Sequence, residues 1–196
     1  GSGVDVERFK PDDRDKSEPP IVALCARMLW EKGIKEFVEA AQIIHAHGKK
    51  IRMVLVGGVD PGNPSSVPEE LLQEWNNKGI VEWWGWQENM LEVYRSSSLV
   101  CLPSFYGEGL ARSLLEAAAC AVPLIATDVP GCRDVIKQNE TGFIVPPHDS
   151  KALANSIMEA VGQPKLLLEM GRKGRKFIIE NYSSEIINKK TYTLYL

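Results

Sequence analysis

Residues 21–56 read IVALCARMLWEKGIKEFVEAAQIIHAHGKKIRMVLV. Two apolar runs of strand length, Ile21–Ala26 and Ile51–Val56, enclose a segment in which apolar residues recur at helical spacing. Gly48 ends the helical pattern before the second run begins. Because both strand-like runs are apolar throughout, we expect each strand to be buried on both faces, as in a parallel sheet. The stretch therefore predicts a strand–helix–strand unit.

The same alternation continues along the chain. Further strands are expected at residues 80–84, 99–102, 124–127 and 142–145. Helices are expected at residues 69–78, 90–95, from the loop after Glu108 to about Cys120, 132–136 as one or two turns, 151–161, 166–180 and from 184 onward. This order predicts an α/β fold, a doubly wound, Rossmann-like parallel sheet of about six strands with helices on both faces. Ligands of such sheets bind beyond the carboxyl ends of the strands.

Charge and hydropathy indicate a protein that binds neither nucleic acid nor the interior of a membrane. The chain has 196 residues and a formal net charge of −3, so a nucleic-acid partner is not expected. Residues 1–20 are polar and end in Pro19-Pro20, which predicts a linker; residues 21–182 form the domain and residues 183–196 a C-terminal helix. The sequence contains no apolar run long enough to span a membrane, and no signal peptide opens it. A cytoplasmic protein, peripheral at most to the inner face of the membrane, is therefore expected.

The cysteines and histidines indicate neither a disulfide framework nor a metal site. None of the four cysteines forms a C-x-x-C pair, and Cys25 and Cys101 lie inside strand-like runs. Buried free thiols in a reducing compartment are favoured over disulfides. His45 and His47 are two residues apart on a helix and point to different faces, so no metal site is predicted.

The strongest functional signal is Glu108-Gly109-Leu110-Ala111-Arg112-Ser113-Leu114-Leu115-Glu116. A helix that follows a glycine loop offers free N–H groups to a phosphate. Glu116 lies among apolar residues, where an unpaired carboxylate would be costly. Two carboxylates beside anion-binding amides suggest a nucleotide sugar as ligand. The alternative is a loop carboxylate plus an Arg112–Glu116 pair one helical turn apart.

Other loops could share this rim. Arg27 and Lys32 follow the first strand and can clamp a diphosphate, or they can be solvated or pair with Glu31 or Glu36. Trp83 and Trp84 should point to opposite faces, and core packing is the favoured explanation for this cluster. A nucleobase could still be bound by main-chain groups near Gly85. The segment Pro130-Gly131-Cys132-Arg133-Asp134 either lines the rim or forms a simple turn. The sequence contains neither a G-x-G-x-x-G motif after the first strand nor a Walker A motif.

These residues together resemble the C-terminal, donor-binding domain of retaining GT-B glycosyltransferases of family four, also called group 1. The matching motifs run nearly end to end: Gly3-Val4-Asp5 with Phe9, Arg27 with Lys32-Gly33, Gly85, Pro103-Ser104, Glu108-Gly109-Leu110 with Glu116, Pro130-Gly131, Thr141-Gly142-Phe143-Ile144-Val145-Pro146-Pro147, and Met170-Gly171 with Gly174-Arg175. The amino-acid sequences of Leu29–Gly33 and Leu110–Ser113 are most similar to those of members that build bacterial surface polysaccharides on lipid carriers.

The resemblance implies a role for each candidate residue. Arg27 and Lys32 would stabilise the leaving diphosphate, and Glu108 would hold the hydroxyls of the donor sugar. Glu116 would accept hydrogen bonds from the ribose. The remaining contacts would be main-chain ones: to the diphosphate or sugar from Gly109, Leu110 and Ala111, and to the base from Gly85 and Trp86. The donor would be a nucleotide-diphosphate sugar, with uridine favoured, and neither a metal nor another cofactor would be needed.

Three positions depart from the family pattern: Ala26 replaces a usual Gly, Ala111 replaces a frequent Pro, and Gly57-Gly58-Val59-Asp60 matches a Gly-Asp-Gly turn loosely. The resemblance also implies a missing N-terminal acceptor domain, to which the final helix would return, and a lipid- or saccharide-linked acceptor. We therefore expect little or no transfer by this chain alone. The alternatives are a non-catalytic nucleotide-binding or interaction module and a sugar-cleaving or sugar-isomerising GT-B enzyme.

Overall fold

The computed structural model describes residues 3–12, 18–107 and 109–194. Its strands are β1 Ile21–Cys25, β2 Arg52–Val56, β3 Glu82–Trp83, β4 Leu99–Leu102, β5 Leu124–Thr127 and β6 Gly142–Val145. They form one sheet with the order β3-β2-β1-β4-β5-β6, and each neighbouring pair is parallel. The predicted doubly wound, six-stranded sheet is confirmed.

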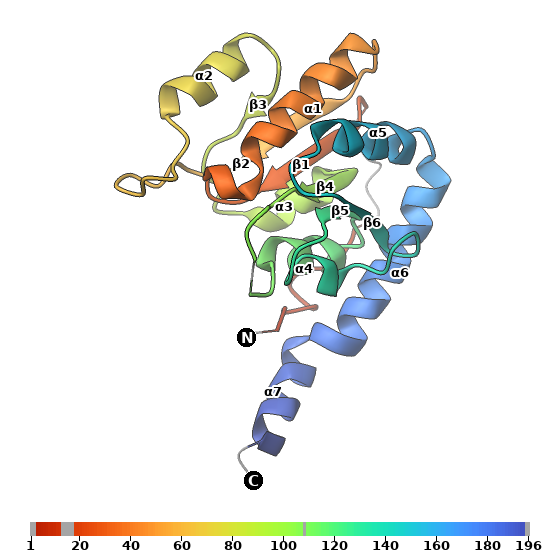
Figure 1. Ribbon diagram of the computed structural model, residues 1–196. Coiled ribbons are helices and arrows are strands. Elements are labelled where there is room, and N and C mark those ends of the chain that lie inside the picture. Colours follow the sequence, from red (N-terminus) through yellow and green to blue (C-terminus); the bar gives the residue numbers. More distant parts are fainter. Residues whose placement is uncertain (1–2, 13–17, 108, 195–196) are drawn as a thin grey trace.

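The α-helices follow the predicted order (Figure 1). They are α1 Ile34–Ala46, α2 Glu69–Asn77, α3 Met90–Ser96, α4 Arg112–Ala119, α5 Ser150–Val161, α6 Pro164–Tyr182 and α7 Ser184–Leu194. Helix α6 begins earlier than predicted because Pro164 occupies its first turn, where no N–H is needed. The predicted turn near residue 133 is a 3-10 helix, Arg133–Val135, and a second one, Trp30–Lys32, was not predicted.

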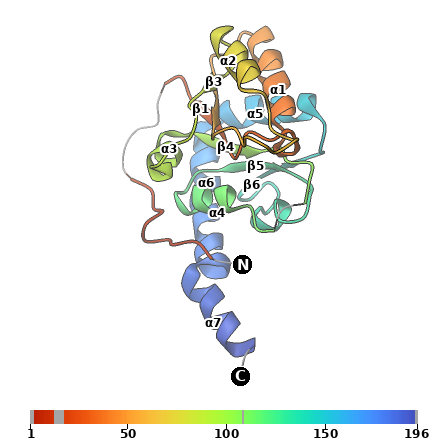
Figure 2. The same cartoon turned by 90° about the vertical axis from the view of Figure 1, so that its left-hand side faces the viewer.

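Two apolar layers hold the helices against the sheet. On β1, Ile21, Ala23 and Cys25 pack into one layer, and Val22 and Leu24 pack into the other. Helices α1 and α5 supply the second layer, whereas α3 and α4 supply the first (Figure 2). Every residue of β1 is buried, which explains why its sequence is apolar without alternation.

Strand β3 is the one element much shorter than predicted. Only Glu82 and Trp83 pair with β2, because β3 lies at the edge of the sheet and Gly85 turns the chain away at a φ of +64°. Trp83 packs against the layer of α1, and Trp84 packs against the layer of α4. The two rings therefore lie on opposite faces, as the alternation of a strand predicts.

Part of the predicted linker is docked on the domain. Val4 and Phe9 are buried, and Val4 forms a β-bridge with Ser183 at the end of α6. The Arg175 guanidinium of α6 donates hydrogen bonds to the carbonyls of Phe9 and Val6. Residues 4–9 are thus fixed to α6 by hydrogen bonds to their main chain, and helix α7 leads away from the sheet beyond this point (Figure 1).

The four cysteines are all free thiols, and all are buried. Burial raises the pKa of the Cys25 and Cys101 thiols well above its usual range, since a thiolate is poorly solvated there. We expect Ellman's reagent to label fewer than about one thiol per folded chain. All four should react in denaturant without reductant. Rapid labelling of the native protein would contradict this.

Candidate functional site

The order of the strands places a switch point between β1 and β4. From this point the chain winds outward in both directions, and ligands of doubly wound sheets bind beyond the carboxyl ends of the strands at such a point. The loops are in main-chain contact, because the Phe105 N–H donates to the Glu31 carbonyl at 3.1 Å. The Ser104 hydroxyl donates to the same carbonyl at 2.8 Å. The candidate residues after β1 and β4 therefore share one rim.

Arg27 lies at the start of this rim and is ion-paired. Its Nη1 is 2.6 Å from the Oδ2 of Asp60, a residue of the loop after β2, and its side chain is 65% exposed. The observed partner is neither Glu31 nor Glu36, the two carboxylates considered from the sequence. Lys32 ends the 3-10 helix of the same loop, and the left-handed Gly33 separates it from the start of α1 at Ile34.

A pocket of about 210 Å³ opens beside Arg27. Its walls include Cys25, Arg27, Gly57, Gly58, Trp86 and Tyr94. Trp86 is 74% exposed, which is unusual for so large an apolar side chain. The neighbouring Gly85 accepts a hydrogen bond from the Gly57 N–H at 2.8 Å, so the turns after β2 and β3 support each other.

Glu116 lies in α4, the helix that follows the glycine loop, and is only 7% exposed. Its Oε1 is 2.7 Å from Arg112 Nε, and its Oε2 accepts from the Tyr94 hydroxyl at 3.0 Å. The Arg112–Glu116 pair considered as the alternative therefore does form. Each carboxylate oxygen has two lone pairs, so both oxygens keep capacity for a ligand hydroxyl.

Tyr94 was not singled out from the sequence. It comes from α3, is almost completely buried and lines the pocket beside Arg27. Burial raises the pKa of its hydroxyl, and the nearby Cys25 and Glu116 raise it further. The phenol therefore stays protonated and donates to Glu116. A tyrosine on an apolar helical face needs a partner for its hydroxyl, and this is the one signal that could have pointed to it.

The glycine loop itself is described only in part. Glu108, the predicted sugar ligand, lies outside the described residues. Gly109 is exposed, whereas Leu110 packs against the layer of α4. The Ala111 N–H, predicted to meet the donor, contacts the Gly131 carbonyl at 3.4 Å. Gly131 thus lies on the same rim, in a turn in which its own N–H donates to the Asp134 carboxylate at 2.9 Å.

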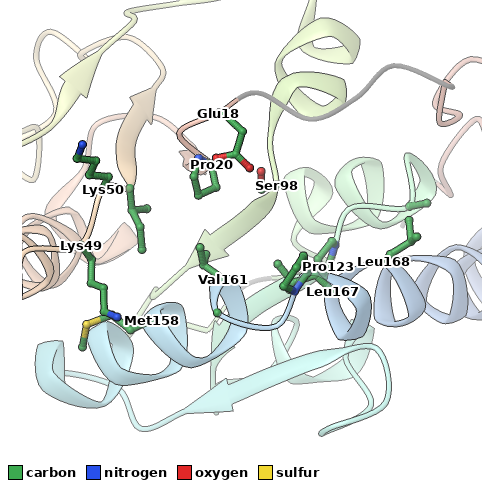
Figure 3. A pocket seen from close by; sticks show the side chains of 14 residues that line it. Glu18, Pro20, Lys49, Lys50, Ser98, Pro123, Met158, Val161, Leu167 and Leu168 are labelled. Atoms are coloured by element: carbon green, nitrogen blue, oxygen red, sulfur yellow. The ribbon is translucent and has the colours of Figure 1, made fainter.

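A larger cavity, about 520 Å³ in volume, lies at the opposite end of the strands (Figure 3). Pro20, Ser98 and Pro123, which precede β1, β4 and β5, form one wall. Met158, Val161 and Leu167 from α5 and α6 form the other. Because ligands of doubly wound sheets bind at the carboxyl ends of the strands, the candidate site is the smaller pocket at the rim.

Within residues 3–12, 18–107 and 109–194, no cluster of three or more histidine, cysteine or acidic side chains could hold a metal ion. Over this same part of the chain, every helix is too short or too polar to cross a membrane.

The sheet order, with its polar side chains gathered beyond β1 and β4, defines a Rossmann-like α/β domain. Residues 5–177 match the family described as glycosyl transferases group 1. The chain belongs to this family.

Its relatives are longer proteins. The N,N'-diacetylbacillosaminyl-diphospho-undecaprenol alpha-1,3-N-acetylgalactosaminyltransferase of Campylobacter jejuni is 34% identical over 205 residues, which cover 98% of this chain and 52% of the relative. The capsular polysaccharide biosynthesis glycosyltransferase CapM of Staphylococcus aureus is 26% identical, with 99% and 52% covered. The chain thus spans about half the length of these curated relatives.

Solved structures share the fold. Sucrose-phosphate synthase from Thermosynechococcus elongatus superposes with a TM-score of 0.85 at 31% identity, over 99% of this chain and 50% of that one. HepE from Anabaena, solved in complex with UDP, has the same TM-score of 0.85 at 21% identity, over 98% of this chain and 55% of its own. The architecture is therefore that of one half of a GT-B enzyme.

Proposed function

We propose that this chain is the donor-binding half of a retaining glycosyltransferase that uses a nucleotide-diphosphate sugar, with UDP as its nucleotide. The observation that carries the proposal is Glu116, a buried carboxylate held by Tyr94 and Arg112 beside the switch point. A fixed carboxylate with remaining lone pairs suits the two vicinal hydroxyls of a ribose. The exposed Trp86 lines the pocket beside Arg27 that Tyr94, the partner of Glu116, also lines, and the base would be held there, next to the turn at Gly85.

The cationic side chains of the loop after β1 neutralise the charge of the diphosphate. Arg27 and Lys32 neutralise the leaving diphosphate, and the loop amides of Gly109 and Leu110 supply additional donors. The Ala111 N–H donates to the Gly131 carbonyl in the free protein and would have to exchange this partner for the donor. In the free protein Arg27 is ion-paired with Asp60, so binding of the donor would replace the Asp60 carboxylate by the diphosphate as the partner of Arg27. Cations fixed where negative charge develops lower the barrier to departure.

Glu108 holds the hydroxyls of the donor sugar. The bond between the anomeric carbon and the diphosphate oxygen breaks, and the acceptor oxygen bonds to the same face of the sugar. The leaving phosphate takes the proton of the acceptor hydroxyl. This route assigns electrostatic work to the protein, and no metal or other cofactor takes part in it.

An N-terminal domain supplies the acceptor site, and the acceptor is a lipid- or saccharide-linked sugar of a polysaccharide pathway. The Campylobacter jejuni relative carries such a lipid, undecaprenol, in its name. A lipid-linked acceptor places the enzyme in the cytoplasm, peripherally at the inner face of the membrane. The chain described here would then bind the donor without completing transfer.

Calorimetric titration of this chain with UDP, GDP and ADP tests the proposal. We expect one of the three nucleotides, UDP, to bind with the tightest dissociation constant. Equal binding of all three would contradict a selective base pocket, and failure of all three to bind would contradict the donor site itself.

Replacing Arg27 by alanine is expected to weaken UDP binding. A hydrogen bond to a charged group contributes about 1.5–3 kcal/mol, so the dissociation constant should rise about ten- to hundredfold. Lys173→Ala is the matched control, because it removes a cation that is ion-paired with Glu169 on α6, away from the rim. An Arg27→Ala variant that binds UDP as tightly as the control would overturn the diphosphate assignment.

A further inference from the structure

Two unfavourable local features meet at the loop after β6. His148 adopts a left-handed backbone with a φ of +58°, a region that only a few per cent of non-glycine residues occupy, although histidine is among the more frequent of them. Glu36, near the start of α1, is 8% exposed, and its Oε2 is buried with no hydrogen-bond partner in the described part of the chain. Strained backbone and unsatisfied buried groups are both rare, and both are found where function requires them.

The two residues contact each other. The His148 Nδ1 lies 3.0 Å from the Glu36 Oε1, across 112 residues of sequence. An ionised carboxylate can only accept, so Nδ1 is the donor and the orientation of the ring is fixed by Glu36. The hydrogen bond is also the one compensation that the Glu36 side chain has in the described part of the chain.

The fixed ring packs on the loop after β4. The centroids of the His148 and Phe105 rings are 4.2 Å apart, with the ring planes inclined by 35°. The main chain of Phe105 is held as well, because its N–H donates to the Glu31 carbonyl. Loops from β1, β4 and β6 therefore converge on Phe105.

We propose that His148, oriented by Glu36, is a positioning residue that fixes the Pro103–Gly107 loop against the rim. The role of this contact in donor binding rests on the proposed function, because the next residue in sequence is Glu108, the proposed sugar ligand. The contact that the His148 ring makes is with Phe105 of this loop. Its loss should therefore affect the sugar half of the donor and leave the nucleotide half unchanged.

Amide hydrogen exchange measured by mass spectrometry tests the positioning directly, without any ligand. His148→Gly removes the ring and relieves the left-handed backbone, so the variant should fold. Loss of an aromatic contact should raise exchange of the peptide containing the Phe105 amide about five- to tenfold. Asn139→Gly is the matched control, since Asn139 has a φ of +62° in the turn before β6. Unchanged exchange at Phe105 in His148→Gly, or an equal rise in the control, overturns the proposal.

Two substitutions at Glu36 test the orienting role. Glu36→Gln keeps an oxygen that accepts from Nδ1, and we expect wild-type exchange at Phe105. Glu36→Leu removes the acceptor without burying a new polar group, and we expect it to raise exchange as His148→Gly does. Wild-type exchange in Glu36→Leu would show that His148 needs no carboxylate to hold Phe105.

Binding of UDP, UDP-glucose and UDP-N-acetylgalactosamine to His148→Gly tests the consequence. We expect the dissociation constant of UDP to be unchanged and that of the sugar nucleotide preferred by the wild type to rise about fivefold or more. Equal weakening of UDP and UDP-sugar would indicate a general structural effect and overturn the link to the sugar. If the wild type binds no nucleotide, the proposed function fails, while the exchange measurement still decides whether His148 positions the loop.

Discussion

Alanine in place of Gly33 is expected to destabilise the domain by about 3 kcal/mol or more. Gly33 has a φ of +76°, and a Cβ added there would lie 2.1 Å from the Pro103 carbonyl oxygen. To relieve this clash, the loop after β1 would have to move away from the main chain of the loop after β4. Because both loops carry proposed donor contacts, UDP binding should fall together with stability.

Gly48→Ala separates the two causes of this loss. Gly48 has a similar φ of +66°, but no atom lies within 4 Å of an added Cβ. Its substitution should cost only the left-handed penalty, about 1–2 kcal/mol. Urea denaturation of both variants measures the difference in unfolding free energy. Equal losses at the two positions would mean that the close approach of Gly33 to Pro103 contributes nothing.

The second large effect is expected at Glu116. Glu116→Ala removes both acceptors proposed for the ribose hydroxyls and leaves the buried Tyr94 hydroxyl without its partner. The dissociation constant of UDP should rise about a hundredfold, since two hydrogen bonds to a charged group are lost. Tyr94→Phe keeps the carboxylate but removes one group that orients it, and we expect a rise of about tenfold or less.

Glu82→Ala is the control for Glu116→Ala. The Glu82 carboxylate is also held by side chains, with Arg52 nitrogens at 2.6 and 2.7 Å, but it lies on the edge strand β3. Hydrogen bonding to Arg52 lowers the pKa of Glu82, so this control also removes a stabilising charge. Calorimetric titration of folded samples of both variants with UDP measures the two dissociation constants and tests the ribose assignment. Similar UDP affinities for the two would refute the ribose assignment.

Local patterns in the sequence were sufficient to predict most helices and strands of the fold. Runs such as Ile21–Cys25 and Leu124–Thr127 are apolar throughout because both sheet faces are covered, and each run forms a strand. The prediction was less accurate for β3, where residues 80–84 have strand-like composition but only Glu82 and Trp83 pair. At the edge of a sheet, pairing depends on a single neighbour and on where the chain turns away.

For the candidate site, the sequence indicated two of the charged residues but not the partners that hold them. Glu116 was found because its apolar neighbours imply burial, and the structure buries it. Its partner Tyr94 lies 22 residues away on another helix, and no local pattern connects the two. Similarly, Arg27 was identified as a rim cation, but its partner Asp60 comes from a loop whose match to the expected turn was loose.

The sequence by itself determined the alternation of strands and helices, the free cysteines, and which charged residues follow each strand. These properties depend on the spacing of neighbouring residues, which is visible in one dimension. Only the tertiary structure decided the partners: Arg27 with Asp60, Glu116 with Tyr94, and His148 with Glu36 and Phe105. The physical reason is that these pairs join loops and helices that follow different strands, and their contacts exist only once the strand order brings those segments side by side.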